Sequence, residues 1–301
     1  MQYRSLGTTG LSLSTIGFGS SPLGNVFGDV ELDECIRAVH CAIDRGINFF
    51  DVSPYYGITL AEERLGHALA GKRDSIFLET KCGRYGYREF DFSAARVTKS
   101  IDESLARLQT DHVDLLHVHD IEFGDAGQIV NETLPALRAI RDSGKCRFIG
   151  ITAYPLSSLL DVASRSTVDA VLSYCHYNLL VDDMDAELTP LCREREIALI
   201  NASPLHMGVL VAQNLPAWHP SPEPVKDAGR RIADACKAAG IDPAVAALRF
   251  CLDHPYVSTT LIGMARQSEV ETNLQALDFH MPPDLKSRID EIAAPVKNTV
   301  L

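Results

Sequence analysis

The sequence predicts an α/β protein folded as a (β/α)8 barrel, in which parallel strands alternate with helices and close on themselves. Short runs rich in Ile, Val, Leu and Phe alternate with longer segments whose apolar residues recur every three to four positions. Eight such pairs follow one another, and eight is the number that closes this barrel. The length of 301 residues suits one barrel with insertions, so we expect a single domain over residues 1–301.

The predicted elements have consistent end signals. The strands are, in chain order, STIGFG, INFFD, SIFLETK, VDLLHVH, CRFIGIT, DAVLSYC, IALINAS and VSTTLIG. The helices lie near residues 31–45, 61–70, 93–109, 128–143, 156–164, 184–196, 243–253 and 267–277. Asp33 and Ser93 are placed to cap helices, and Pro243 to lie in a first helical turn. Gly46 and Gly144 are placed to end helices. An open doubly wound sheet is the alternative, but GFGSSPLG lacks the third glycine of that fold's fingerprint.

Two segments lie outside this alternation. Near the N-terminus, YRSLGTTGLSLS has alternating apolar residues around a Gly-rich turn. It predicts a β-hairpin placed to plug the N-terminal end of the barrel. Residues 213–225, QNLPAWHPSPEPV, contain four prolines and the lone tryptophan, Trp218. They predict a long, rigid loop after the seventh strand, which is either a substrate lid or a plain surface connection.

Charge and composition limit the partners and the compartment. The formal net charge is −12 and the sequence pI about 5.3, which argues against nucleic acid and anionic membranes as partners. The N-terminal segment lacks the apolar core of a signal peptide, and no apolar run reaches membrane-spanning length, so we expect a cytoplasmic protein. The eight cysteines include no CxxC pair and are expected to be reduced packing residues. The alternative for Cys82 is a reactive thiol beside Lys81.

Titratable residues gather at the ends of three predicted strands. Asp51 and Tyr56 lie in FFDVSPYYG, Lys81 ends IFLETK, and His119 ends VDLLHVH. A parallel barrel brings these strand ends together at one mouth. A phenol has a pKa of about 10, so Tyr56 needs a cation such as Lys81, oriented by Asp51, to exchange protons at neutral pH. With His119 bonding the same substrate oxygen, the cluster predicts proton-transfer chemistry.

A metal site is the alternative for the fourth strand. His117 and His119 form an H-x-H pattern that metal-dependent hydrolases of barrel fold use to bind Zn²⁺, and His176 and His206 follow later strands. In those hydrolases, however, the pattern lies on the first strand, and here Lys81 ends the strand before it. We therefore interpret His117 as a histidine of the barrel wall and expect no metal.

These motifs resemble the Asp–Tyr–Lys–His tetrad of aldo-keto reductases. The tetrad residues of that family correspond to those in DVSPYYG, ETKCG and VDLLHVH. The resemblance extends from LGTTGLSLSTIGFG through GKCRFIGIT and NASPL to GMARQSEVETNLQAL. It implies hydride transfer to or from a nicotinamide cofactor, with Tyr56 as proton carrier, Lys81 and Asp51 lowering its pKa, and His119 orienting the substrate.

Within the family, the loops resemble those of enzymes that oxidise L-galactose. They read SSPLGNVFG, ETKCGRYG, LHVHDIEFG, LSYCHYN, NASPLHMG and PVKN. This implies oxidation of an L-galactose-like aldose at C1 to an aldonolactone, with L-fucose and D-threo-aldose oxidation as close neighbours. The alternatives are a general aldehyde or ketone reductase of the same family and a non-catalytic subunit that binds cofactor for sensing.

The resemblance also implies binding residues. Cofactor contacts fall on Gly19, Ser20, Thr152, Tyr174, Ser203, Leu205, Gly208, Gly263, Met264, Arg266, Glu269 and Asn273. Substrate contacts fall on Ser21, Arg84, Asp120 and Trp218. The chain departs from the family pattern where Thr152-Ala153 replaces Ser-Asn, Tyr174 replaces Gln, and Ala202 replaces the stacking Tyr. Glu269 would repel a 2′-phosphate and Arg266 would attract one, and on balance we expect NAD rather than NADP.

Overall fold

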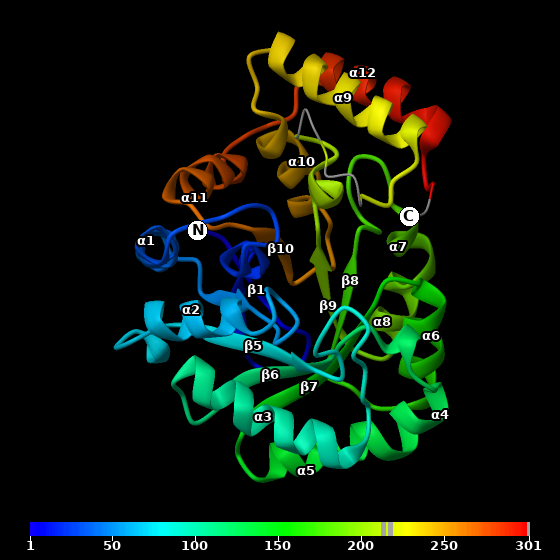
Figure 1. The fold of residues 1–301 in the computed structure, drawn as a ribbon. Helices are drawn as coiled ribbons and strands as arrows, with labels where there is room; N and C mark the ends of the chain where they lie inside the picture. The colour runs from blue at the N-terminus through cyan, green and yellow to red at the C-terminus, as the bar shows by residue number, and fades with distance from the viewer. Residues whose placement is uncertain (212–214, 216–218, 300–301) are drawn as a thin grey trace.

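The computed structural model of the chain describes residues 1–211, 215 and 219–299. In this part, eight parallel strands form a closed barrel (Figure 1): β3 (Ile16–Gly19), β4 (Phe49–Asp51), β5 (Phe77–Cys82), β6 (Val113–Val118), β7 (Cys146–Ala153), β8 (Ala170–Tyr174), β9 (Ala198–Ala202) and β10 (Thr259–Gly263). Each strand pairs with the next along the chain, and β10 pairs with β3 to complete the circle. The predicted fold class and the predicted strands are confirmed.

All eight predicted helices are present, two of them in a different form. The matching helices are α1 (Leu32–Asp44), α2 (Leu60–Ala68), α3 (Ala94–Leu108), α6 (Leu156–Arg165), α10 (Pro243–Leu252) and α11 (Gln267–Leu274). The segment predicted at 128–143 runs from α4 (Ala126–Gln128) through a π-helical stretch (Ile129–Thr133) into α5 (Leu134–Asp142). The segment predicted at 184–196 is divided into α7 (Asp183–Glu187) and α8 (Thr189–Glu194). Pro190 lies in the first turn of α8, where its missing N–H is tolerated.

Two described helices were absent from the prediction. They are α9 (Glu223–Ala238) and α12 (Pro283–Ala293), which lie side by side at the top of Figure 1. Val225, Ile232 and Leu285 belong to the apolar core that they share. The loop predicted over 213–225 therefore ends earlier, because Pro224 lies in the first turn of α9, where proline is compatible with a helix.

The predicted helix ends are partly correct. Ser93 caps α3 by accepting a hydrogen bond from the backbone N–H of Arg96 at 3.3 Å. Asp33 does not cap α1, because the helix begins at Leu32, so Asp33 lies in the first turn, where a carboxylate suits the helix dipole. Gly46 and Gly144 follow helices at positive φ, as predicted. None of the described helices combines the length and apolar character that crossing a membrane requires.

The predicted N-terminal hairpin is present and closes one end of the barrel. Strands β1 (Tyr3–Ser5) and β2 (Ser12–Ser14) pair antiparallel. Leu6, Leu11 and Leu13 pack in one buried cluster with barrel residues that include Leu115, Ile200 and Leu261. This end of the barrel interior is therefore apolar, and the C-terminal strand ends form the other, polar end.

Candidate active site

The structure brings the four predicted tetrad residues together at the C-terminal strand ends. Asp51 ends β4, Lys81 lies on β5, His119 directly follows β6, and Tyr56 lies in the turn after β4. Lys81 forms an ion pair with Asp51 and donates to the carbonyl oxygen of Val52 at 3.0 Å. The Lys81 Nζ lies 5.0 Å from the centroid of the Tyr56 ring, and the His119 ring meets that ring edge-on with centroids 5.8 Å apart.

Ser53 fixes the orientation of His119, a role that no motif in the sequence indicates. Its Oγ is hydrogen-bonded to His119 Nδ1 at 3.0 Å and accepts the backbone N–H of Tyr55 at 3.1 Å. Its carbonyl oxygen accepts the backbone N–H of Tyr56 at 3.1 Å. One short turn thus positions both the phenol and the imidazole, and leaves His119 Nε2 for other contacts.

Burial and charge set the protonation of the cluster. Burial raises the pKa of Tyr56 well above its usual value, and the positive charge of Lys81 acts in the opposite direction. Asp51 raises this pKa as well, so the net lowering of the Tyr56 pKa expected from Lys81 and Asp51 is not found. Burial alone would lower the pKa of Lys81, but Asp51 and the other nearby acidic groups outweigh it, and the net pKa is raised. Burial lowers the pKa of His119 to about 3, so its imidazole is neutral at physiological pH.

The histidines of the metal alternative have other partners. His117 Nδ1 is hydrogen-bonded to Glu79 Oε1 at 2.7 Å, and His176 Nδ1 to Asp183 Oδ1 at 2.8 Å. His206 Nδ1 lies 3.3 Å from the Asn178 side-chain amide. In the described part of the chain, no three His, Cys, Asp or Glu side chains are placed to share a metal ion. Cys82 is buried, and burial raises its thiol pKa, which is typical of a packing residue.

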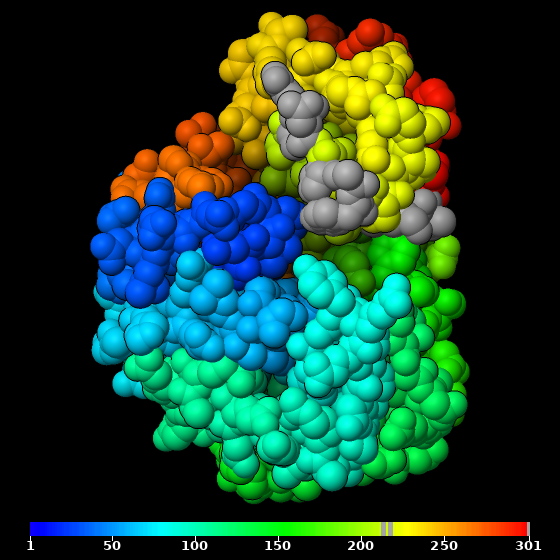
Figure 2. Space-filling model, viewed as in Figure 1, coloured from blue at the N-terminus to red at the C-terminus, as the bar shows by residue number. Residues whose placement is uncertain are grey.

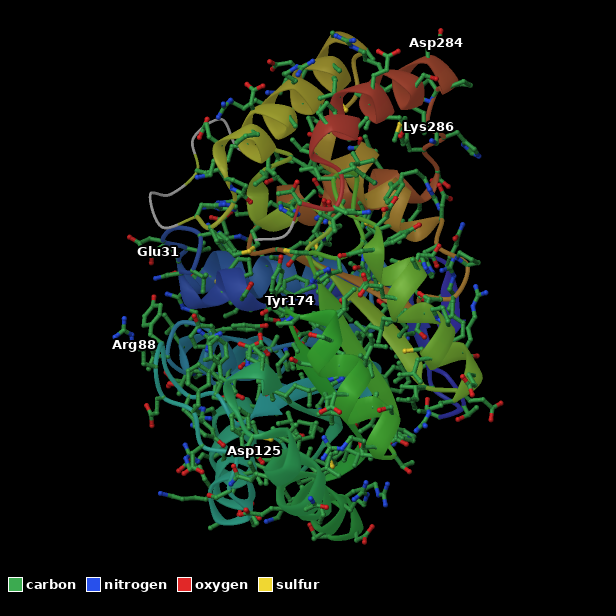
Figure 3. All side chains as sticks on the ribbon, turned by 90° about the vertical axis from the view of Figure 1, so that its right-hand side faces the viewer. Glu31, Arg88, Asp125, Tyr174, Asp284 and Lys286 are labelled. Atoms are coloured by element: carbon green, nitrogen blue, oxygen red, sulfur yellow. The ribbon has the colours of Figure 1, made fainter. Side chains whose placement is uncertain are left out.

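A second polar layer adjoins the tetrad. Asp120, one of the predicted substrate residues, forms an ion pair with Arg84 and lies 3.7 Å from His119 Nε2. The Arg84 guanidinium stacks on the Tyr55 ring at 3.6 Å. Tyr174, labelled in Figure 3, ends β8 and donates from its hydroxyl to Asp120 at 3.3 Å. These contacts place polar groups from several strands around one opening.

Of the other two predicted substrate residues, Ser21 and Trp218, only Ser21 is among the described residues. Ser21 begins a short 3-10 helix (Ser21–Gly24) directly after β3 and is partly exposed. Trp218 lies outside the described residues.

Exposed apolar side chains line the rim of the opening. Phe27, Ile58, Tyr87 and Phe123 are each more than half exposed and belong to the segments that follow β3, β4, β5 and β6. Figure 2 shows the first three segments, in blue, light blue and cyan, next to one another on one face. The charged centre is therefore surrounded by a rim that includes apolar surface.

The predicted cofactor residues lie on the same face of the barrel. Gly19, Thr152, Tyr174 and Gly263 lie at or near the C-terminal ends of β3, β7, β8 and β10, while Ser20, Ser203, Leu205, Gly208 and Met264 are in the segments that follow β3, β9 and β10. The hydroxyl oxygens of Ser20 and Thr152 are buried without a hydrogen-bond partner among the described residues. Such atoms fit the polar groups of a bound ligand.

Glu269 and Arg266 meet at the start of α11. Glu269 Oε2 accepts the backbone N–H groups of Ala265 at 2.7 Å and Arg266 at 3.0 Å. The two side chains also approach to 3.6 Å. The carboxylate thus takes up N–H groups at a helix start that would otherwise suit an anion. Asn273, the remaining predicted cofactor residue, is buried near the end of this helix.

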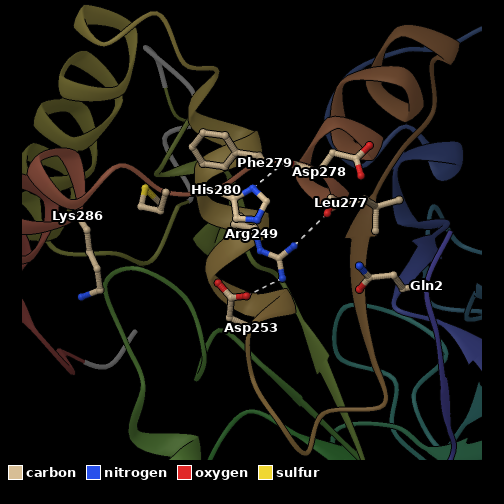
Figure 4. A pocket seen from close by; sticks show the side chains of 9 residues that line it. Gln2, Arg249, Asp253, Leu277, Asp278, Phe279, His280 and Lys286 are labelled. Atoms are coloured by element: carbon tan, nitrogen blue, oxygen red, sulfur yellow. Dashed lines mark hydrogen bonds and ion pairs between the residues drawn. The ribbon is translucent and has the colours of Figure 1, made fainter.

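A groove of about 660 Å³ lies away from the tetrad (Figure 4). Its lining includes Gln2, Arg249, Asp253 and Lys286. Arg249 is paired with Asp253 at 2.6 Å, and Lys286 with Asp290 at 2.6 Å, so these two basic side chains already have partners. The tetrad at the barrel mouth remains the candidate active site.

The chain is similar to known proteins in both sequence and structure. A profile of the Aldo/keto reductase family matches residues 15–294. L-galactose dehydrogenase of Arabidopsis thaliana is 46% identical over 99% of this chain and 96% of its own. D-threo-aldose 1-dehydrogenase of Pseudomonas sp is 29% identical over 94% of each chain. The holo form of an aldo-keto reductase from Bacillus halodurans superposes with a TM-score of 0.82 and 26% identity, covering 100% of this chain and 98% of its own. The chain belongs to the aldo/keto reductase family.

Proposed function

We propose that this protein is an NAD-dependent aldose 1-dehydrogenase that oxidises an L-galactose-like sugar at C1 to the aldonolactone. The buried ion pair of Lys81 and Asp51 beside Tyr56 and His119 is the observation that carries this proposal. The 46% identity to a plant L-galactose dehydrogenase supports the choice of substrate class. One barrel unit, residues 1–301, would hold both the cofactor and the sugar.

The tetrad suits proton removal from a sugar hydroxyl. Tyr56 accepts the proton of the C1 hydroxyl, and the Lys81 ammonium stabilises the phenolate that this requires. Asp51 holds the ammonium in place. Neutral His119, oriented by Ser53, hydrogen-bonds to the same sugar oxygen. When bound, NAD supplies the hydride acceptor.

The cofactor shell supports a nicotinamide dinucleotide with a free ribose hydroxyl. The unpartnered hydroxyls of Ser20 and Thr152 would bind the carboxamide end, and the turn from Ser203 to Gly208 would hold the pyrophosphate. Glu269 occupies the start of α11 with a negative charge, which disfavours the 2′-phosphate of NADP. NAD is therefore the proposed cofactor.

The second polar layer suits a hydroxyl-rich substrate. Arg84, Asp120 and Tyr174 present charged and hydroxyl groups next to His119 Nε2. A site built from such groups selects substrates that can pair with them, because an apolar analogue would leave them unpaired. Together with Ser21 and Trp218, these residues are the proposed sugar contacts.

Initial rates with a panel of substrates test the proposal. L-galactose, L-fucose and D-arabinose would be oxidised with NAD and with NADP, and simple aldehydes reduced with NADH and NADPH. We expect the highest kcat/KM for L-galactose with NAD. A preference for simple aldehydes would favour a general reductase, and cofactor binding without turnover of any substrate would favour a sensing subunit.

A further inference from the structure

A second pair of polar, titratable side chains lies inside the barrel beneath the tetrad. Glu79 on β5 and His117 on β6 are fully buried, and their side chains are joined by a hydrogen bond of 2.7 Å. Each lies two residues before a tetrad member, Glu79 before Lys81 on β5 and His117 before His119, which directly follows β6. Because side chains alternate along a strand, all four point to the same side of the barrel wall.

Glu79 also faces the tetrad lysine. Its Oε1 lies 3.7 Å from Lys81 Nζ, and the same ammonium is paired with Asp51. Lys81 therefore lies between two carboxylates, while His117 holds the second carboxylate in place.

The barrel accommodates Glu79 and His117 through a glycine on the next strand, and burying their polar atoms costs free energy. Gly150 on β7 is directly opposite His117, and a Cβ atom there would lie 2.3 Å from His117 Nε2. Glu79 Oε2 and His117 Nε2 have no hydrogen-bond partner among the described residues. An apolar pair of similar size would avoid the penalty of burying these groups. The pair is thus better explained by its effect on Lys81 than by packing.

We propose that Glu79, held by His117, is a positioning residue that keeps Lys81 protonated and in place from inside the barrel. This inference rests on the proposed function, in which the Lys81 ammonium stabilises the Tyr56 phenolate. Asp51 and Glu79 then act as two counter-charges for one ammonium. Either of them is sufficient at neutral pH, and the loss of both leaves a buried ammonium without a carboxylate.

The charged and titratable groups around Lys81 are consistent with this role. Asp51 comes from β4, Tyr56 from the turn after it, and Glu79 from β5 itself. The carboxylates of Asp51 and Glu79, and Tyr56 when it is deprotonated, keep the pKa of Lys81 above its usual value although burial acts to lower it. His117 and His119 face the same region from β6, and the neutral state of His119 adds no competing positive charge.

Titration of Lys81 tests the electrostatic part without any turnover. The ¹³Cε resonance of Lys81, assigned by its loss in K81R, would be followed against pH in D51N and in D51N/E79Q. We expect the pKa of Lys81 to be lower by at least about one unit in the double variant, because no carboxylate remains beside the ammonium. Equal pKa values in the two variants would overturn the proposal.

Kinetics test the catalytic part. If either carboxylate suffices, D51N and E79Q each have a modest effect, and the double variant loses about tenfold more kcat/KM than the product of the single losses. As the pH is raised, the activity of the double variant should begin to decline at a lower pH than that of the single variants, because its Lys81 ammonium deprotonates earlier. Losses that simply multiply, with an unshifted profile, would overturn the positioning role. If Y56F retained turnover, the proposed function would fail. The Lys81 titration would still test whether Glu79 stabilises the Lys81 ammonium.

Glu62 provides a matched control. It is another fully buried carboxylate, and it accepts hydrogen bonds at 2.6 Å from Thr80 on the outer face of β5 and from Arg107. D51N/E62Q should lower the Tm and leave the Lys81 titration as in D51N. D51N/E79L repeats the main test with an apolar residue of similar size. A Lys81 shift that is as large in D51N/E62Q as in D51N/E79Q would contradict the proposal.

Discussion

The two ends of the barrel differ in what they bury. At the N-terminal end, the hairpin residues Leu6, Leu11 and Leu13 fill the interior with apolar atoms. At the C-terminal end, the interior holds Asp51 and Lys81 with almost no exposure to solvent. Burying charge is costly, whereas burying leucine is favourable. Apolar burial at the N-terminal end therefore stabilises the fold and offsets the cost of burying the charged tetrad at the C-terminal end.

The largest effect is expected on removing the Tyr56 hydroxyl, which tests whether the chemistry is confined to the C-terminal end of the barrel. Y56F should lower kcat/KM by about a thousandfold, because the proton acceptor is lost, with little change in Tm or in NAD affinity. Initial rates, thermal melts and fluorescence titration with NADH measure the three quantities. Y55F is the matched control, since this neighbouring ring contacts Arg84 but has no proposed proton to carry. Turnover in Y56F close to that of the wild type would refute the proposed mechanism.

The converse change weakens the apolar end. L13A should reduce the free energy of unfolding by about 3 kcal/mol, because it opens a cavity at a fully buried position. The kcat of the folded fraction should stay close to that of the wild type. Denaturant unfolding followed by rate measurement at low temperature checks both, with S12A on the exposed face of the same strand as control. A large fall in kcat would show that the two ends are coupled.

A third variant concerns the outer edge of the mouth. E269Q keeps a hydrogen-bond acceptor at the start of α11 but removes its charge, so kcat/KM with NADP should rise about tenfold relative to NAD. Rates with both cofactors measure this ratio. E271Q, on the same helix, should leave the ratio unchanged, and equal responses of the two variants would argue against a local effect.

The smallest expected effect concerns pH. Burial and the nearby Asp120 raise the pKa of Glu122 to about 7. Because the folded-state pKa lies above the unfolded value of about 4.3, ionisation favours unfolding, and stability is lost as pH rises between these values. E122Q should therefore gain in Tm relative to the wild type from pH 4 towards pH 7 and stay level above it. A Tm difference that does not change over this range would contradict the assigned pKa.

The fold was predictable because its strands are short apolar runs of regular spacing, and the strand ends pointed to Asp51, Lys81 and His119. Glu79 was not predictable, because a glutamate inside a strand commonly faces solvent and only barrel closure places it beside His117. The helix α9 was missed because its proline-rich beginning resembles a loop. Ser53 was missed because a serine in a turn has many ordinary roles.

The hairpin has a consequence for the order of events in turnover. Its leucine side chains close the N-terminal end of the barrel, so the site is open at the C-terminal end. On the proposed function, the sugar enters and the lactone leaves through the same C-terminal mouth. The lactone must then be released before the next sugar binds, so passage through the rim is one step of the catalytic cycle. Substitutions among the rim segments would change the timing of release while the bond-breaking step stays the same.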